Sequence, residues 1–273
     1  RMVEWQKSTQ IKYPGVALEM AFNGEGAGEE YSPDTLIPTV ASNNTMFYWI
    51  NHTYDHANLD SISYQDALTT LQLNRQVARQ QLRLSTFYTT AMVQPDVSGL
   101  HNVEFLRAAA DLGISYMVSD SSQVGWDSPT PNTGFVSELD SRVFIIPRRP
   151  VNLFYNVTTP EEWMDEYNSM YGPGGKWETW TTSRGYKQIK VFEAGQLLNR
   201  MLKFEVNPWM FHQSNLRAYD GKRSLLGDLL DVTLGTYSEY YKIPVRNLSQ
   251  RQVGQRMQQR MSFNASQVKA TLI

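Results

Sequence analysis

The sequence predicts an α/β fold in which parallel strands are joined by helices. Short apolar runs rich in β-branched and aromatic residues alternate with longer runs whose apolar residues recur every three to four positions. Such alternation is typical of parallel strands with right-handed crossovers, in an open sheet or in a barrel. A chain of 273 residues can bury one large core, so we expect a single domain over residues 1–273.

The first two strands are predicted near the start of the chain. The run Val16–Phe22 ends at Asn23-Gly24-Glu25-Gly26, where the glycines favour a turn. Ser32-Pro33-Asp34 then offers a helix start. The apolar, aromatic run Met46–Ile50 is typical of a buried strand.

The longest predicted helix begins at Ser63, because Ser63-Tyr64-Gln65-Asp66 resembles a capping box and opens an amphipathic run to about Leu82. Gly113 is expected to end one helix, and Thr159-Pro160-Glu161-Glu162 is expected to begin another. The segment 171–180 is the longest irregular one and is rich in aromatic residues. The remaining strands are expected at 87–93, 114–118, 143–146 and 209–211, and the remaining helices at 102–112, 163–170, 193–203 and 224–240.

Composition excludes several classes of protein. The formal net charge is −2 and basic residues form no block, so we expect neither a nucleic acid nor a membrane surface as partner. No stretch approaches 18 apolar residues, so no membrane span is expected. Cysteine is absent, which excludes disulfides, thiolate nucleophiles and cysteine-ligated zinc.

Five N-x-(S/T) acceptor sequences favour a secreted or cell-wall-associated glycoprotein; they begin at Asn43, Asn51, Asn156, Asn247 and Asn264. The site at Asn51 is expected to stay unmodified, because a glycan there would block the histidines that follow it. The start at Arg1 shows no signal-peptide pattern, so we expect a mature piece or a fragment.

Two histidines four residues apart, His52 and His56, directly follow the second predicted strand. Two imidazoles at this spacing can reach the same divalent cation, for which zinc is the expected ion. The same spacing also occurs in histidines that only make surface hydrogen bonds, so the pattern alone leaves both interpretations open.

The residues around this pair resemble the second motif of the metal-dependent polysaccharide deacetylases, with Ala57 where those enzymes commonly have proline. The resemblance runs from about Tyr13 to about Val245. It points to one branch, which contains a fungal galactosaminogalactan deacetylase and the deacetylase domain of the bacterial Pel exopolysaccharide protein. The segments that carry it are 51–60, 95–102, 113–120, 146–150 and 207–216.

The resemblance implies a deformed (β/α) barrel with its site at the carboxyl ends of the strands. It implies that His52 and His56 bind the metal and that His212 protonates the departing amine. Arg148 would orient a carboxylate or bind sugar hydroxyls. Asp120 would contact residues of the site without binding the metal itself. Tryptophans are candidates for stacking on sugar rings, above all Trp177 and Trp180 in the irregular segment, with Trp126 and Trp209 as weaker ones.

One part of the family pattern is missing. These enzymes place an aspartate pair at the end of their first strand, as catalytic base and third metal ligand, and no such pair precedes His52. We therefore expect a chain that begins after that first strand, or a lineage that has lost both groups.

The sequence thus predicts a metal-dependent deacetylase of an amino-sugar exopolysaccharide, one that contains N-acetylgalactosamine and belongs to a fungal biofilm. A non-catalytic carbohydrate-binding or scaffold protein on the same fold is the alternative. A metallohydrolase acting on peptides or phosphate esters is disfavoured, because neither H-E-x-x-H nor a phosphate loop is present.

Overall fold

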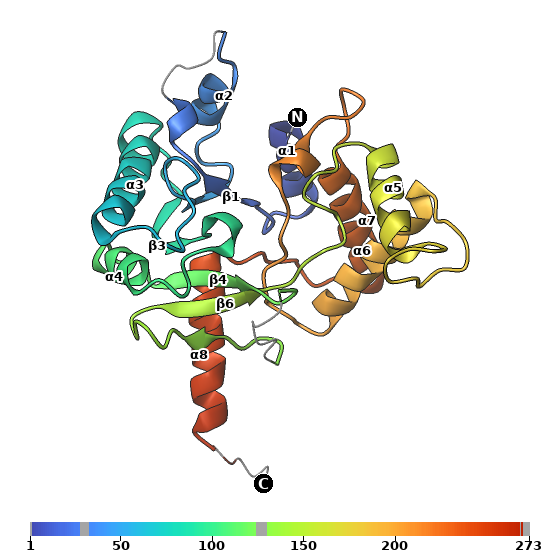
Figure 1. Ribbon diagram of the computed structural model, residues 1–273. Coiled ribbons are helices and arrows are strands. Elements are labelled where there is room, and N and C mark those ends of the chain that lie inside the picture. Colours follow the sequence, from blue (N-terminus) through green and yellow to red (C-terminus); the bar gives the residue numbers. More distant parts are fainter. Residues whose placement is uncertain (1, 28–32, 124–129, 268, 270–273) are drawn as a thin grey trace. The chain divides into compact units, whose positions relative to one another are not determined.

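The structure is a computed structural model that describes residues 2–27, 33–123, 130–267 and 269 (Figure 1). It contains two compact units. One unit comprises Arg1–Gly15 and Arg149–Val245, and we call it the helical unit; the other comprises Val16–Arg148 and Arg246–Ile273, and we call it the sheet unit. Whether both together make the single domain that we expect from the sequence stays a prediction.

The sheet unit is built on six strands in the order β1-β2-β3-β4-β6-β5. Neighbouring strands pair in parallel from β1 to β6, and only β5 runs antiparallel to β6. The predicted α/β class with a parallel sheet is therefore confirmed. The described pairings follow this open order, and the strands are β1 (Glu19–Phe22), β2 (Tyr48–Asn51), β3 (Phe87–Met92), β4 (Tyr116–Asp120), β5 (Phe135–Val136) and β6 (Phe144–Arg148).

Helices cover both faces of this sheet. Met117 and Ile145 are register partners and belong to the buried cluster that includes side chains of α3 (Tyr64–Gln76) and α4 (Val103–Asp111). Side chains alternate along a strand, so the neighbouring Tyr116 and Ile146 point to the other face. There they meet Gly254 of α8 (Gln250–Ala265), which lies across β3, β4 and β6 (Figure 1).

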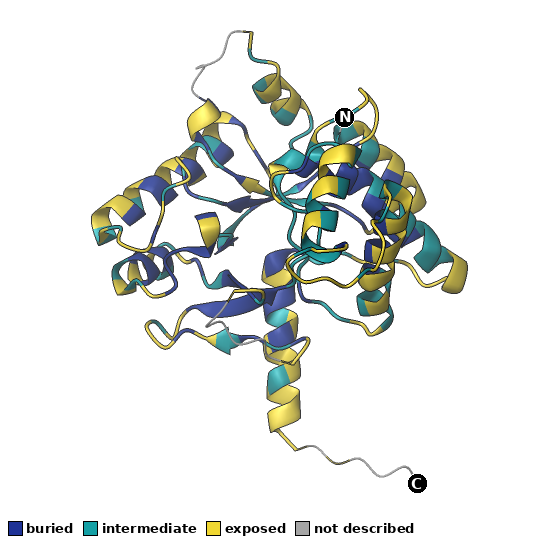
Figure 2. Cartoon of the chain, turned by 45° about the vertical axis from the view of Figure 1, so that its right-hand side comes forward, coloured by how far each residue is buried: buried dark blue, intermediate teal, exposed yellow. Residues whose placement is uncertain are grey.

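Burial follows this layering. The strands β2, β4 and β6 are largely buried (Figure 2), because apolar side chains on both faces are covered by helices. Along α8 only Gln250, Val253, Gly254 and Met257 are buried, so the far turns of this helix are exposed (Figure 2).

The predicted local signals form the expected contacts. The Ser63 hydroxyl accepts from the backbone N–H of Asp66 and starts α3, whose helical path continues as a π-helical turn at Val77–Gln81. Gly113 ends α4 with φ 81°, a conformation that glycine adopts readily. Asp34 caps α2 (Leu36–Ser42), whereas the predicted start residue Ser32 lies outside the described residues.

The helical unit holds four α-helices among the described residues: α1 (Met2–Lys12), α5 (Pro160–Tyr171), α6 (Tyr186–Leu202) and α7 (Leu225–Tyr240). Helix α6 packs against both α5 and α7. The Asp228 carboxylate of α7 accepts from the hydroxyls of Tyr186 and Tyr219 at 2.6 and 2.7 Å, which ties α6 and a neighbouring loop to α7.

Four elements differ from the sequence prediction. Helix α6 begins seven residues before Glu193, where Gln188 caps the N–H of Gly185. Among the described residues, the strand expected at 209–211 is reduced to one parallel bridge between Arg149 and Trp209. Helices α1 and α8 were not predicted; α8 has few apolar residues, so its helical pattern is weak in the sequence.

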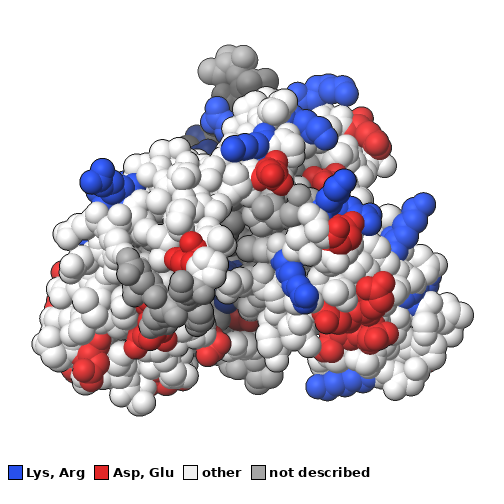
Figure 3. All heavy atoms as spheres, turned by 90° about the horizontal axis from the view of Figure 1, so that it is seen from above, with Lys and Arg blue, Asp and Glu red and all other residues white. Residues whose placement is uncertain are grey.

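Charged side chains of both signs are scattered over the face drawn in Figure 3, and most of that face is uncharged. This agrees with the near balance of 25 basic and 27 acidic residues. Among the described residues, no helix has the length and apolar character needed to cross a membrane.

Candidate active site

Polar side chains gather at one edge of the sheet unit. The strands β1, β2, β3, β4 and β6 are parallel, so their carboxyl ends meet at the same edge, which is where α/β folds place their ligands. The residues that end these strands or follow within a few positions are Asn23, His52, Asp96, Asp120 and Arg148.

The structure brings the two predicted metal ligands together. The ring centroids of His52 and His56 lie 4.9 Å apart, with the rings at 77° to each other. His52 is partly buried and His56 is exposed. The Nδ1 atom of His52 lies 2.7 Å from the carbonyl oxygen of Val93, so the proton belongs on Nδ1 and the lone pair on Nε2. This tautomer is the one that leaves Nε2 able to bind a cation.

Burial is the largest cause of a lowered His52 pKa, which falls to about 4. The charges of His56 and Arg148 lower the pKa further, whereas the hydrogen bond to Val93 and the charge of Asp96 raise it. His52 is therefore neutral at physiological pH, the form in which imidazole binds metals.

Three asparagines hold the backbone of the histidine loop. The Asn51 side-chain oxygen accepts from the N–H of Thr53 at 2.9 Å and from the Asn74 amide at 2.8 Å. The Asn23 amide donates to the carbonyl oxygens of His52 at 2.5 Å and of Thr53 at 2.9 Å. Asn51 and Asn74 are buried, so these bonds are sheltered from water.

The loop ends adopt unusual backbone conformations. Thr53, His56, Asp96 and Val97 all have φ between 51° and 63°, in the left-handed region that non-glycine residues rarely enter. Such conformations persist where the surrounding contacts enforce them, and they cluster at functional sites. Here they lie in the two loops that follow β2 and β3.

Arg148 and Asp120 are register partners on the neighbouring strands β6 and β4. Arg148 is buried, its Nε atom has no hydrogen-bond partner among the described residues, and burial lowers its pKa to about 10. The charge of Asp120 partly offsets this by raising the pKa. Asp120 itself accepts from the N–H and the hydroxyl of Ser122, at 2.9 and 2.6 Å.

Asp96 is a residue of this edge to which sequence reasoning assigned no role. It lies in the short 3-10 turn Pro95–Val97, four residues after the end of β3, and its charge acts on His52. An acidic residue in the loop that follows a strand of a parallel sheet is the signal that could have found it.

The described residues supply two imidazole ligands for a metal, and two imidazoles are suitable ligands for zinc. Among these residues, no group of three histidine, cysteine, aspartate or glutamate side chains is placed to hold an ion. Glu19, one of the few acidic residues before His52, lies at the start of β1, at the opposite edge of the sheet.

His212 belongs to the helical unit, where it precedes the short 3-10 helix Gln213–Leu216. Its backbone N–H donates to the buried Asn215 at 3.0 Å, and its ring lies 5.9 Å from that of Tyr155. The Asn215 amide in turn donates to the carbonyl oxygens of Phe154 and Val157, which fixes this turn. That His212 lies close to His52 and His56 stays a prediction.

The two predicted stacking tryptophans lie in the irregular segment of the helical unit. Trp177 is 53 % exposed, with the Lys176 ammonium 4.6 Å from its ring. Trp180 is partly buried between Arg184, 4.2 Å from its ring, and Phe192, whose ring it meets edge to face at 5.0 Å. Trp126 lies outside the described residues.

The fold is similar to that of a carbohydrate deacetylase. Residues 32–271 match the family described as "Agd3 deacetylase domain", and the chain belongs to this family. The predicted resemblance to the galactosaminogalactan deacetylase branch is thereby confirmed.

One solved structure extends this comparison. It is described as "Crystal structure of Agd3 a novel carbohydrate deacetylase" and resembles the chain with a TM-score of 0.79 at 18 % sequence identity. The match covers 97 % of this chain and 50 % of that protein, so the chain spans about half of its length. A comparison with curated proteins finds no match.

Proposed function

We propose that this chain removes N-acetyl groups from an amino-sugar polysaccharide with the help of a divalent metal, zinc being the expected ion. N-acetylgalactosamine is the proposed sugar. The observation that carries the proposal is the close pair of His52, which is neutral, and His56 at the carboxyl edge of a parallel sheet, in a member of a deacetylase family.

The proposed metal residues are His52 and His56, and the Val93 carbonyl keeps the ring of His52 in the required tautomer. A bound zinc ion would supply a Lewis acid for the amide carbonyl and a lowered pKa for water. The asparagine contacts fix the loop backbone before any metal binds, so little conformational freedom is lost on binding.

Amide hydrolysis breaks the C–N bond, transfers the oxygen of water to the acyl carbon and leaves the nitrogen needing a proton. We assign that proton donation to His212, a role that suits the imidazole near neutral pH. Arg148, a buried cation whose Nε–H has no partner among the described residues, would donate a hydrogen bond to a ligand oxygen at the same edge as His52. Asp120 would keep Arg148 charged.

The exposed ring of Trp177 and the partly buried ring of Trp180 are the proposed platforms for pyranose rings. We also propose that the protein is secreted or associated with the cell wall. Acceptor sequences such as that at Asn156 support this location, because they are exposed and so accessible to glycosylation. The product amines would make the polymer cationic and adhesive.

Acetate release tests the proposal. The full-length protein, incubated with N-acetylated galactosamine oligosaccharides and zinc, should release acetate, and a chelator should stop it. The His212→Ala variant should lose at least about 100-fold in turnover together with one limb of the pH profile. Normal turnover in that variant would exclude His212 as the acid.

The same assay separates the proposal from the alternative of a non-catalytic binding or scaffold protein. Sugar binding that survives chelation, without acetate release from any amino-sugar polymer, would favour the alternative and defeat the proposed enzyme.

A further inference from the structure

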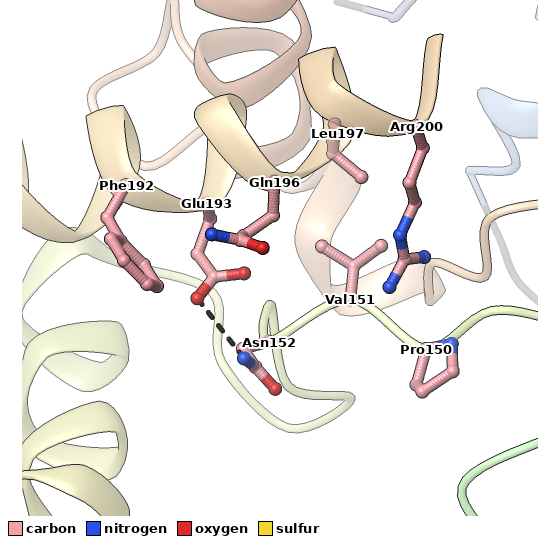
Figure 4. A pocket seen from close by; sticks show the side chains of 8 residues that line it. All are labelled: Pro150, Val151, Asn152, Phe192, Glu193, Gln196, Leu197 and Arg200. Carbon is pink, nitrogen blue, oxygen red and sulfur yellow. Dashed lines mark hydrogen bonds between the residues drawn. The ribbon is translucent and has the colours of Figure 1, made fainter. Parts of the chain in front are cut away.

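A cavity in the helical unit is lined by none of the residues that we assign to catalysis. Its volume is about 230 Å³, and it is formed by the loop 150–152 and one face of α6 (Figure 4). The α6 residues that line it are spaced as one helix face, from Phe192 through Gln196 to Arg200. The volume lies below the roughly 300–1,000 Å³ of pockets for drug-sized ligands, so it suits a single sugar ring.

One wall of the cavity carries an open hydrogen-bond donor. The Nη1 atom of Arg200 is buried and has no hydrogen-bond partner among the described residues. Figure 4 shows the Arg200 guanidinium reaching from α6 toward Pro150 and Val151. Burial lowers the Arg200 pKa, and the charge of Glu205 raises it. A buried donor without a partner is costly, so an acceptor oxygen in the cavity would be bound favourably.

The same α6 wall is acidic and buried about two turns before Arg200. Glu193 is 2 % exposed and accepts from the Asn152 amide at 3.1 Å and from the Tyr167 hydroxyl at 3.0 Å. The Asn152 side-chain oxygen accepts from the Tyr171 hydroxyl at 3.1 Å, so the position of Asn152 is fixed as well. Burial raises the pKa of Glu193, and its hydrogen bonds oppose this.

The charges of these walls select the ligand. An ammonium group beside Arg200 would meet a like charge, and so would a carboxylate beside Glu193. A neutral group with a strong acceptor oxygen and a small apolar part avoids both of these repulsions. An acetamide has this chemistry, because its carbonyl oxygen can accept from Arg200 and its methyl can contact Val151 and Leu197, which also line the cavity.

The cavity also touches the predicted sugar platform. Phe192 lines the cavity, is 39 % exposed, and meets Trp180 edge to face. An aromatic side chain at the rim can contact the apolar face of a pyranose ring. A sugar held in the cavity would therefore lie next to the aromatic segment that contains Trp177 and Trp180.

We infer that this cavity is a holding subsite for one N-acetylated amino-sugar unit, with the acetamide oxygen bound by Arg200, the methyl group against Val151 and Leu197, and the ring beside Phe192. The inference rests on the proposed function for the choice of an amino-sugar polymer. The subsite binds substrate and carries out no chemistry, and it prefers acetylated units over units that have already lost the acetyl group.

Binding of monosaccharides by the full chain, measured by saturation-transfer NMR with a chelator present, tests the subsite without catalysis. N-acetylgalactosamine should bind more tightly than galactosamine, galactose or acetate. The Arg200→Met variant should weaken N-acetylgalactosamine binding by about tenfold, the effect of losing about 1.4 kcal/mol. Lys187→Met, which removes an exposed cation from the same helix, should leave binding unchanged.

A second variant distinguishes loss of the subsite from loss of the fold. Gln196→Trp, at an exposed position of α6 that lines the cavity, should fill the cavity and abolish the same binding while circular dichroism stays unchanged. The inference is overturned if both variants bind N-acetylgalactosamine like the unmodified protein, or if galactosamine or acetate binds equally well. Acetate release is scored separately, so failure of the subsite and failure of the proposed function give different results.

Discussion

The rings of His52 and His56 lie edge to face, 4.9 Å apart between centroids, although one side chain is partly buried and the other exposed. The positive φ of His56 turns the chain back toward the strand end that carries His52. Their proximity is therefore a product of the loop conformation and not of a helix, which the four-residue spacing alone would suggest.

Replacing either histidine with alanine tests the pair as metal ligands. His52→Ala and His56→Ala should each lower turnover by more than about 100-fold, because even residues that only orient a ligand cost 10–100-fold. Zinc affinity, measured by calorimetry, should fall in parallel. His101→Ala, which removes an exposed histidine outside the pair, is the control. Unchanged zinc affinity in both variants would exclude the pair.

Asn51 should remain unglycosylated although it begins an acceptor sequence. It is 4 % exposed, and its amide nitrogen donates to the Leu71 carbonyl oxygen at 3.2 Å, so a sugar on that nitrogen is incompatible with the folded chain. Glycopeptide mass spectrometry of secreted, active protein should find Asn156 modified in its exposed position and Asn51 bare. Occupancy at Asn51 in active protein would contradict the placement of the site.

Glu19 should make the fold less stable as the pH rises from about 4.5 to 7. Burial raises its pKa to about 7, whereas the hydrogen bond from the Gln250 N–H lowers it. The unfolded chain releases this proton near pH 4.5, whereas the folded chain holds it up to about pH 7. The contribution of Glu19 to stability is therefore fully present below pH 4.5 and is lost as the pH rises through about 7. The free energy of unfolding lost in this way is on the order of 3 kcal/mol.

Urea unfolding across this pH range checks the contribution. Glu19→Gln keeps an acceptor for Gln250 and should be more stable than the unmodified protein at pH 8, with the difference vanishing near pH 4. Glu25→Gln, at an exposed position, should change little at either pH. Equal stability of Glu19→Gln and the unmodified protein at pH 8 would refute the assignment.

Gly254 should be needed for the docking of α8. A Cβ there would collide with the ring of Tyr116 and come within 3.1 Å of Ile146 Cδ1, so Gly254→Ala should destabilise the protein by about 1–3 kcal/mol. At Gly195 of α6 nothing lies within 4 Å of an added Cβ, and Gly195→Ala should stabilise by up to about 1 kcal/mol. Thermal melting of both variants compares them, and equal shifts would contradict close packing of α8 on β4.

Local chemistry in the sequence determined much of this protein. The capping residues Ser63, Asn102 and Thr159 start their helices where expected, because an N-cap bonds to a backbone N–H only two or three residues away. The parallel sheet followed from the alternation of elements. The histidine pair was found because its two members lie within five residues at the end of a buried strand.

Tertiary structure decided the contacts between distant residues. Asn74 reaches Asn51 and the carbonyl oxygen of Phe22, Asp96 acts on His52, and Gly254 meets Tyr116, each across a separation that no local pattern encodes. The cavity beside Arg200 arises in the same way, because its two walls come from segments some forty residues apart. Short-range hydrogen bonding can be read along the chain, whereas burial, and the pKa values that burial shifts, exist only once remote segments exclude water together.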